Sequence, residues 1–193
     1  MSEGRVIHGI DLDKLEAFRT AIKENPVTLG LESRSVWEGH TGRNTTHIGP
    51  FKLNGERIDR EDRQYKIEYG AWKEVEETIG AVEPEDRMEP VEMALSAIGA
   101  CLSNSIGLNA ARHDIPLEGM EITVRADVDP SVLFEVKGPE AHTACIPNIS
   151  CDVKVKGDLT DEQLAEIQRL IAYSPVHGMV AEHNDIKSTV TRQ

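Results

Sequence analysis

The residue with the clearest chemical potential is Cys101, one of three cysteines in a chain of 193 residues. A thiol becomes a nucleophile when a nearby cation or a helix N-terminus lowers its pKa. Cys101 lies about three turns inside a predicted helix, where the dipole is weak, so another element must supply a cation. Arg43 is the candidate because Gly42-Arg43 falls in a tight turn that could deliver a guanidinium. In the plainer alternative, Cys101 is a small buried hydrophobic residue and Arg43 is a solvated surface residue.

The other cysteines and the histidines are weaker candidates. An odd number of cysteines does not make a disulfide framework. His142-x-x-Cys145 with Cys151 could hold a metal, but a closed zinc site needs tighter pairs of ligands and the chain has no Cys-x-x-Cys. We therefore expect no metal and no cofactor. Ser174 and His177 could serve hydrolase or transferase chemistry, although the sequence identifies no acid to orient the histidine.

A long uncharged helix must position Cys101. The sequence pattern predicts this helix at residues 90–112, because Pro90 suits a first turn and the run from Met93 to Ala111 carries no charge. The stripe at helical spacing comprises Val91, Leu95, Ile98, Leu102 and Ile106. The polar residues in the run favour a buried helix of a soluble protein over a membrane span. We expect a sheet or a partner subunit to cover it.

The remaining pattern indicates an α+β fold. Two more helices are predicted: one at residues 11–25, and one that begins with the capping box of Thr160 and Gln163 and ends at Ser174-Pro175. Residues 27–83 look strand-rich, and residues 74–88 look like an acidic loop. Further strands are expected at 120–129, 149–156 and 186–190, with a long connection over 129–148. The expected organisation is an N-terminal helical extension, 1–26, and one domain, 27–193.

Composition excludes several classes of partner. The chain has 34 acidic and 21 basic residues, a net charge of -13, and no Lys/Arg cluster. Nucleic acid and anionic membranes are therefore poor partners, since both require a basic face. The start of the chain lacks a basic patch followed by an apolar run, so no signal peptide is expected. We expect a cytoplasmic protein with reduced thiols.

Three segments resemble those of the OsmC/Ohr family, the osmotically induced and organic-hydroperoxide-resistance proteins. The likeness extends from about Val36 to Val190. The central-helix motif is Pro90-x-Glu92-x-x-Leu95-x-Ala97-x-Gly99-Ala100-Cys101. The turn into the next strand is Ala111-Arg112-His113-Asp114-Ile115-Pro116-Leu117-Glu118-Gly119, and the second signature is Ile171-Ala172-Tyr173-Ser174-Pro175-Val176-His177. The order and spacing of the three make the resemblance fairly specific.

The resemblance implies an intertwined homodimer, with long central helices packed against curved antiparallel sheets. It also implies thiol peroxidase chemistry in oxidative-stress defence, with Cys101 attacking an organic hydroperoxide. Arg43 would lower the pKa of that thiol and orient the peroxide, and Glu92 would be the accompanying acid. The family's acid directly follows the helix-opening proline, where this chain has Val91, so Glu92 is rotated by about 100°. Its plainer alternative is a first-turn carboxylate favoured by the helix dipole.

Ser174 stands where the family's second signature usually has a cysteine. Serine cannot form a disulfide with Cys101, so the two-cysteine cycle is closed to this chain. The first hypothesis is therefore a one-cysteine peroxidase with an external thiol reductant and with Ser174 and His177 near the substrate. The second is a catalytically inactive family member that binds a small apolar molecule. Hydrolase or transferase chemistry at Ser174 and His177 is the third.

Overall fold

The computed structural model describes residues 5–182 and 186–192. The chain forms two compact units, and each is described by itself. Unit 1 comprises Met1–Leu12 and Leu95–Gln193, and unit 2 comprises Asp13–Ala94. The long helix α3, Pro90–Arg112, begins in unit 2 and continues through unit 1. Its bounds confirm the helix predicted at residues 90–112.

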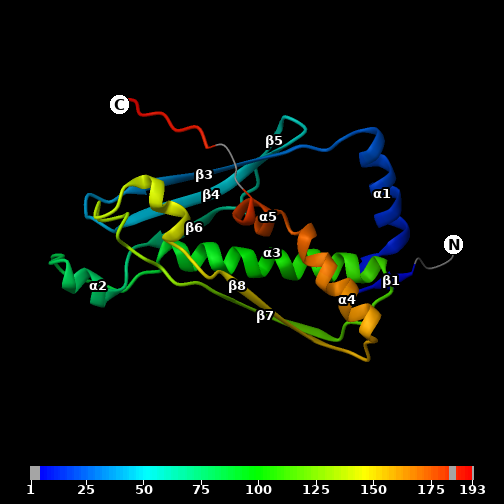
Figure 1. Ribbon diagram of the computed structural model, residues 1–193. Helices are drawn as coiled ribbons and strands as arrows, with labels where there is room; N and C mark the ends of the chain where they lie inside the picture. Colours follow the sequence, from blue (N-terminus) through cyan, green and yellow to red (C-terminus); the bar gives the residue numbers. More distant parts are fainter. Residues whose placement is uncertain (1–4, 183–185, 193) are drawn as a thin grey trace. The chain divides into compact units, whose positions relative to one another are not determined.

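Unit 2 is built around a four-stranded antiparallel sheet (Figure 1). The long strand β4 pairs with β3 along one side and with β5 and β6 along the other. Helix α1, which begins at Leu12, confirms the helix expected near residues 11–25. The elements are α1 (Leu12–Glu24), β3 (Leu29–Trp37), β4 (Asn44–Leu53), β5 (Glu56–Ile58), β6 (Tyr65–Tyr69) and α2 (Lys73–Thr78).

The turn from β4 to β5 shows how the sequence specifies a hairpin. Asn54 and Gly55 both have positive φ, 51° and 86°, which is the geometry that Asn-Gly favours in a two-residue turn. The Asn54 side-chain carbonyl also accepts a hydrogen bond from the Thr28 backbone N–H at 2.9 Å. Asn54 and Gly55 therefore form the turn that joins β4 to β5.

Unit 1 combines α3 with an antiparallel hairpin, β7 and β8, and with the helix α4, which crosses α3 in Figure 1. The Thr160 and Gln163 capping box that starts α4 is present in both directions. The bounds are β1 (Val6–Ile7), β2 (Ile10–Asp11), β7 (Gly119–Arg125), β8 (Ser150–Lys156), α4 (Asp161–Leu170) and α5 (Pro175–Ala181), with 3-10 turns η1 (Pro139–Ala144) and η2 (Ile171–Tyr173).

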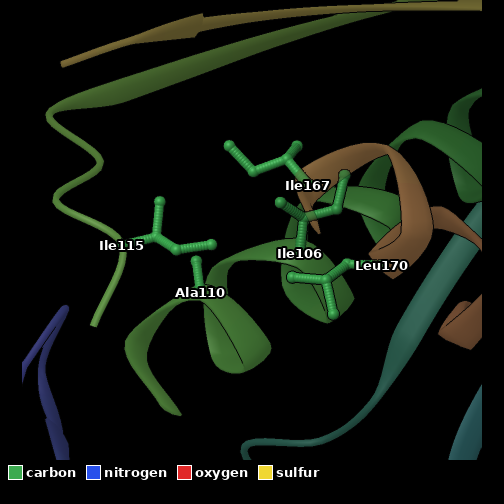
Figure 2. Close-up of a cluster of buried hydrophobic side chains, with 5 residues drawn as sticks. All are labelled: Ile106, Ala110, Ile115, Ile167 and Leu170. Atoms are coloured by element: carbon green, nitrogen blue, oxygen red, sulfur yellow. The ribbon is translucent and has the colours of Figure 1, made fainter. Parts of the chain in front are cut away.

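The core of unit 1 lies between these elements. Figure 2 shows side chains of α3, of α4 and of the segment before β7 gathered in one cluster. Its buried members are Ile106, Ala110, Ile115, Ile167 and Leu170, and inward-facing residues of β7 and β8 pack against them. The cluster holds the middle and the C-terminal half of α3 in place, and Cys101 lies just before it.

Only part of α3 is covered in the single chain. Ile98, Leu102 and Ile106 are buried on one face, whereas Ala100, Asn104 and Leu108 are exposed on another. The expectation that most of the helix surface is buried is therefore not met by one chain alone. Among the described residues, α3 is long and apolar enough to cross a membrane. This criterion of length and composition is also met by core helices of soluble proteins.

Four element predictions need correction. Residues 74–88 are not all loop, because α2 occupies Lys73–Thr78. The strand expected over 120–129 ends at Arg125, where its pairing with Ser150 ends. Ser174-Pro175 does not only end a helix: it also starts α5, with Ser174 as N-cap and Pro175 in the first turn. The strand expected near 186–190 does not form in the described residues 186–192, where no strand pairing is found.

Candidate functional site

Cys101 lies in the middle of α3 within unit 1 and is half-buried. Its neighbour one turn earlier, Ile98, is almost fully buried, so Cys101 lies beside the packed face of the helix. Among the described residues of unit 1, its Sγ makes no hydrogen bond. The thiol is therefore a free, partly accessible sulfur on a rigid element, which is the minimum that nucleophilic chemistry requires.

Arg43 is held in unit 2 by the loop that joins β3 to β4. Gly39 and Gly42 adopt positive φ, and Arg43 closes the loop with two backbone hydrogen bonds: its N–H donates to His40 and its carbonyl accepts from Glu38. Its side chain is only 13% exposed. The sequence prediction of Arg43 in a tight Gly-Arg turn between strands is therefore confirmed.

The guanidinium of Arg43 is bound by carboxylates of its own unit. Its Nη2 lies 3.2 Å from Glu76 Oε2 and its Nε lies 3.2 Å from Glu85 Oε1. Nη2 also donates to the Glu83 backbone carbonyl. Two carboxylates already compensate the charge of Arg43, so its field at any other group is weakened.

Glu76 is the least expected member of this cluster. Its side chain is 1% exposed, and its Oε2 accepts the Glu85 backbone N–H at 3.0 Å besides the Arg43 guanidinium. These two interactions, the backbone hydrogen bond first, hold the pKa of Glu76 below its usual value despite burial. Sequence reasoning did not single out Glu76 and Glu85, because they are two among many acidic residues in one segment.

The ion cluster continues through Arg87. Its guanidinium contacts Glu85 Oε1 at 2.6 Å and Glu38 Oε2 at 3.0 Å. Glu38 also accepts a hydrogen bond from Thr45 Oγ1 at 2.7 Å, which with Arg87 lowers the pKa of its carboxyl group. The network thus ties the strand ends of the unit 2 sheet to the segment that follows α2.

Glu92 caps the start of α3. Its Oε2 accepts the backbone N–H of Glu89 at 3.0 Å, while the Glu89 carboxylate accepts the N–H of Val91 at 2.5 Å. Both hydrogen bonds satisfy backbone donors that a helix start leaves unpaired. The structure therefore gives the Glu92 carboxylate a structural task at the helix end.

Ser174 and His177 are brought together at the start of α5. Ser174 is 2% exposed, and its Oγ accepts the His177 backbone N–H at 3.3 Å, as an N-cap does. The hydroxyl thus bonds the main chain of His177 and not its imidazole, and His177 also lines a cavity. This is not the side-chain pairing that a serine nucleophile and its base require.

The cavity lies within unit 1 and has a volume of about 390 Å³. Its wall includes Ile98 of α3, Cys151 of β8 and His177 of α5, but not Cys101. Burial, and secondarily the neighbouring Asp152, raises the pKa of the Cys151 thiol. The alternation in residues 149–156 placed Cys151 on the inner face of its strand, but no sequence signal joined it to His177.

Cys145 directly follows η1, and its Sγ donates to the Ala141 carbonyl at 3.4 Å. Among the residues that the structure describes, no three His, Cys, Asp or Glu side chains gather as a metal site would require. By unit, Cys101, Ser174 and His177 belong to unit 1, and Arg43 and Glu92 belong to unit 2.

An α+β fold with a cysteine in the middle of a long helix, beside an antiparallel hairpin, defines the class of protein. The chain matches the family model described as OsmC-like protein over residues 83–189, more than half of its length. It therefore belongs to the OsmC-like protein family. The resemblance carried by the motifs around Cys101 and Ser174 is thereby confirmed.

Solved structures are similar in fold but distant in sequence. An OsmC-like protein from Mycoplasma pneumoniae is 13% identical, with a TM-score of 0.54 over 78% of this chain and 86% of that one. An organic hydroperoxide resistance protein OsmC from Legionella pneumophila is 15% identical, with a TM-score of 0.47 over 78% and 88%. The first of these supports the OsmC-like fold. A search of curated proteins finds no match.

Proposed function

We propose that this protein reduces organic hydroperoxides through the thiol of Cys101, in a one-cysteine reaction. The observation that carries the proposal is the position of Cys101, a half-buried free thiol in the middle of α3 and within the segment that matches the family. The resemblance of the motifs around Cys101 and Ser174 to the OsmC/Ohr family suggests organic hydroperoxides as the substrate class. A role in oxidative-stress defence follows from this chemistry.

The reaction starts with attack of the Cys101 thiolate on one peroxide oxygen. The O–O bond breaks, the sulfur is oxidised to a sulfenic acid, and the leaving alkoxide takes a proton to become an alcohol. An external thiol then condenses with the sulfenic acid and releases water. A second external thiol then attacks the external sulfur of the mixed disulfide, so that the S–S bond to Cys101 breaks, an external disulfide leaves and the Cys101 thiolate is restored. A reducing cytoplasm, the proposed location, would supply these thiols.

Ser174 supports the one-cysteine form of this cycle. Its buried hydroxyl is engaged as the N-cap of α5, so the position that carries the family's second cysteine has a purely structural occupant. An external thiol must therefore resolve the sulfenic acid. His177, in the wall of the nearby cavity, is the residue that we propose to contact substrate.

We propose Arg43 as the cation that lowers the pKa of the Cys101 thiol, although its carboxylate partners reduce this effect. Its Nη1 has no partner among the described residues of unit 2, so one donor nitrogen remains for a peroxide oxygen or a thiolate. Glu76 and Glu85 offset its charge, which limits how far it can lower the pKa of a thiol. For Glu92 we propose a positioning role, since its carboxylate fixes the first turn of the helix that carries Cys101.

A second copy of the chain is the proposed partner. Ala100, Asn104 and Leu108 recur every four residues along α3 and are exposed in the single chain. An uncharged helix face with side chains of this size is suited to pack against another helix. A homodimer through α3 would cover this face.

Trapping of the sulfenic acid tests the peroxidase proposal. The protein receives one equivalent of cumene hydroperoxide with dimedone, and intact mass spectrometry follows adduct formation within seconds. We expect an adduct on the wild type and none on Cys101→Ser, with Cys145→Ser and Cys151→Ser as controls that retain it. The absence of an adduct on the wild type would refute the proposal.

The cavity favours a second candidate function, a catalytically inactive OsmC-like protein that binds a small molecule. Its volume suits a ligand, and Cys101 is outside its wall. Retention of a ligand by Cys101→Ser, together with no dimedone adduct on the wild type, would select this function.

A further inference from the structure

The cavity of unit 1 is lined by residues of four elements. Ile98 comes from α3, Cys151 from β8, Ile171 from the turn after α4, and Val180 from α5. Ile98 is 3% exposed and forms part of the packed face of α3. The volume of about 390 Å³ lies near the lower end of the range for small-molecule sites, which begins at about 300 Å³.

The described residues in the wall of this cavity are apolar or neutral. Among the described residues that line it there is no Asp, Glu, Lys or Arg, although 28% of the chain is charged. A charged ligand group would lose its hydration there without gaining an ion pair, which is unfavourable. The wall therefore selects against permanently charged molecules.

Two residues of the wall carry polar side chains that solvent or a ligand can reach: Gln168 is exposed and His177 is half-buried. Neither the Gln168 amide nor the His177 imidazole makes a side-chain hydrogen bond among the described residues. The Ser174 hydroxyl fixes the His177 main chain at the start of α5, so the imidazole emerges from a defined position. Both groups can donate and accept, so they suit a hydroxyl or carbonyl oxygen on the ligand.

Cys151 contributes a neutral surface. Its pKa is raised by burial and by Asp152, so the thiol stays protonated near neutral pH and behaves as a small apolar group. Because a thiolate is needed for nucleophilic attack, Cys151 lines the cavity without reacting readily with what enters it.

We propose that this cavity is a binding site for one compact apolar molecule with a single neutral hydrogen-bonding group, such as a medium-chain alcohol. The apolar body contacts Ile98, Ile171 and Val180, and the hydroxyl bonds Gln168 or His177. This inference rests on the second candidate function, the binding of a small molecule, and it does not require Cys101 to react with peroxides, because Cys101 is outside the wall of the cavity.

Protection of Cys151 from alkylation tests the proposal. The Cys101→Ser protein is treated with N-ethylmaleimide, with and without 1-octanol, and peptide mass spectrometry follows the two remaining thiols. We expect octanol to slow modification of Cys151 at least about fivefold and to leave the modification rate of Cys145, which follows η1, unchanged. Octylammonium, which has the same chain with a permanent charge near neutral pH, should give little protection.

Two alanine variants provide a matched pair. Ala181 lines the cavity and Ala165 is an exposed residue of α4 that does not. Ala181→Trp should remove the effect of octanol, and Ala165→Trp should retain it. If Ala181→Trp fails to fold, saturation-transfer NMR of octanol with Gln168→Leu replaces it, and weaker binding is expected.

Three results would overturn the proposal. Octanol could leave the rate at Cys151 unchanged or slow Cys145 equally, which would mean no specific site. Octylammonium could protect as well as octanol, which would mean generic apolar binding. Cys151 could resist alkylation without any probe until the assembly is dissociated, which would show that a second copy of the chain fills the cavity.

Discussion

Arg43 and Glu76 form a buried ion pair within unit 2, with Arg43 Nη2 3.2 Å from Glu76 Oε2. The carboxylate is 1% exposed and the guanidinium 13% exposed, so neither partner can be rehydrated fully if the other is removed. Loss of one partner from such a pair is costly because a charge remains buried without compensation. The pair joins the β3–β4 loop to α2 and, together with Glu85, fixes where Arg43 points.

Glu76→Gln should destabilise the protein, because Arg43 keeps its charge and loses its most buried counter-ion. We expect the melting temperature to fall by roughly 5 °C or more. Glu68→Gln is the control, since Glu68 pairs with Lys66 at an exposed site, and its effect should stay within about 2 °C. Equal effects of the two substitutions in a calorimetric scan would show that the buried pair does not stabilise the fold.

The same pair predicts a pH dependence. The pKa of Glu76 is held below its ordinary value of 4.5, chiefly by the Glu85 backbone hydrogen bond and then by Arg43. A lowered carboxyl pKa contributes stability that is present above pH 4.5 and is lost as the pH falls further. Urea denaturation from pH 7 to pH 3 should therefore show a shallower loss for Glu76→Gln than for the wild type. An identical loss would assign the acid sensitivity to other carboxyl groups.

Asp152→Asn should make Cys151 more reactive. Burial raises the pKa of Cys151 first, and the negative charge of Asp152 raises it further. Removal of that charge should lower the thiol pKa and increase its alkylation by iodoacetamide at pH 8 by about twofold. Asp158→Asn, in the turn after β8, is the control and should leave the rate unchanged. An unchanged rate for Asp152→Asn would leave burial as the sole cause.

Ser174→Ala should remove the N-cap of α5. The Ser174 hydroxyl accepts the His177 backbone N–H, and loss of such a cap costs about 1 kcal/mol. Ser103→Ala, at an exposed position within α3, should change stability by only a few tenths of a kcal/mol. Urea denaturation of both variants measures the difference, and a Ser174→Ala protein as stable as Ser103→Ala would show that the hydroxyl is dispensable.

Leu108→Asp should disrupt the proposed homodimer. Leu108 is 39% exposed on the uncovered face of α3, and a charge at a helix–helix contact would be buried without a partner. Light scattering should give about twice the chain mass of 21.4 kDa for the wild type and the single-chain mass for the variant. Leu133→Asp, at a position 79% exposed in the 129–148 connection, should remain dimeric. A monomeric wild type would remove the basis of the prediction.

Local sequence signals account for the elements that were predicted correctly. Pro90 and an uncharged apolar stripe specify α3 almost to the residue, and the Thr160–Gln163 capping box specifies the start of α4. Alternation placed β8 correctly, with Cys151 on its inner face. Each signal acts within a few residues along the chain, so a single sequence carries it completely.

The errors arise where a local signal is ambiguous. Ser174-Pro175 stops one helix and starts another, because the same residues satisfy both a helix end and an N-cap. The α2 segment was hidden by its many carboxylates, which resemble a solvated loop. Residues 126–129 alternate like a strand, but the partner strand begins at Ser150, opposite Arg125, so they have no partner to pair with.

The sequence by itself determined the family, the long helix with Cys101, the tight turn with Arg43, and the serine at position 174. Tertiary structure alone decided what these residues touch. It paired Arg43 with Glu76 and Glu85, and it used Glu92 and Ser174 as helix caps. It also placed Cys151 and His177 around one cavity. The reason is physical: a burial pattern or a cap is encoded by neighbours along the chain, whereas an ion pair or a cavity depends on residues that only folding brings together.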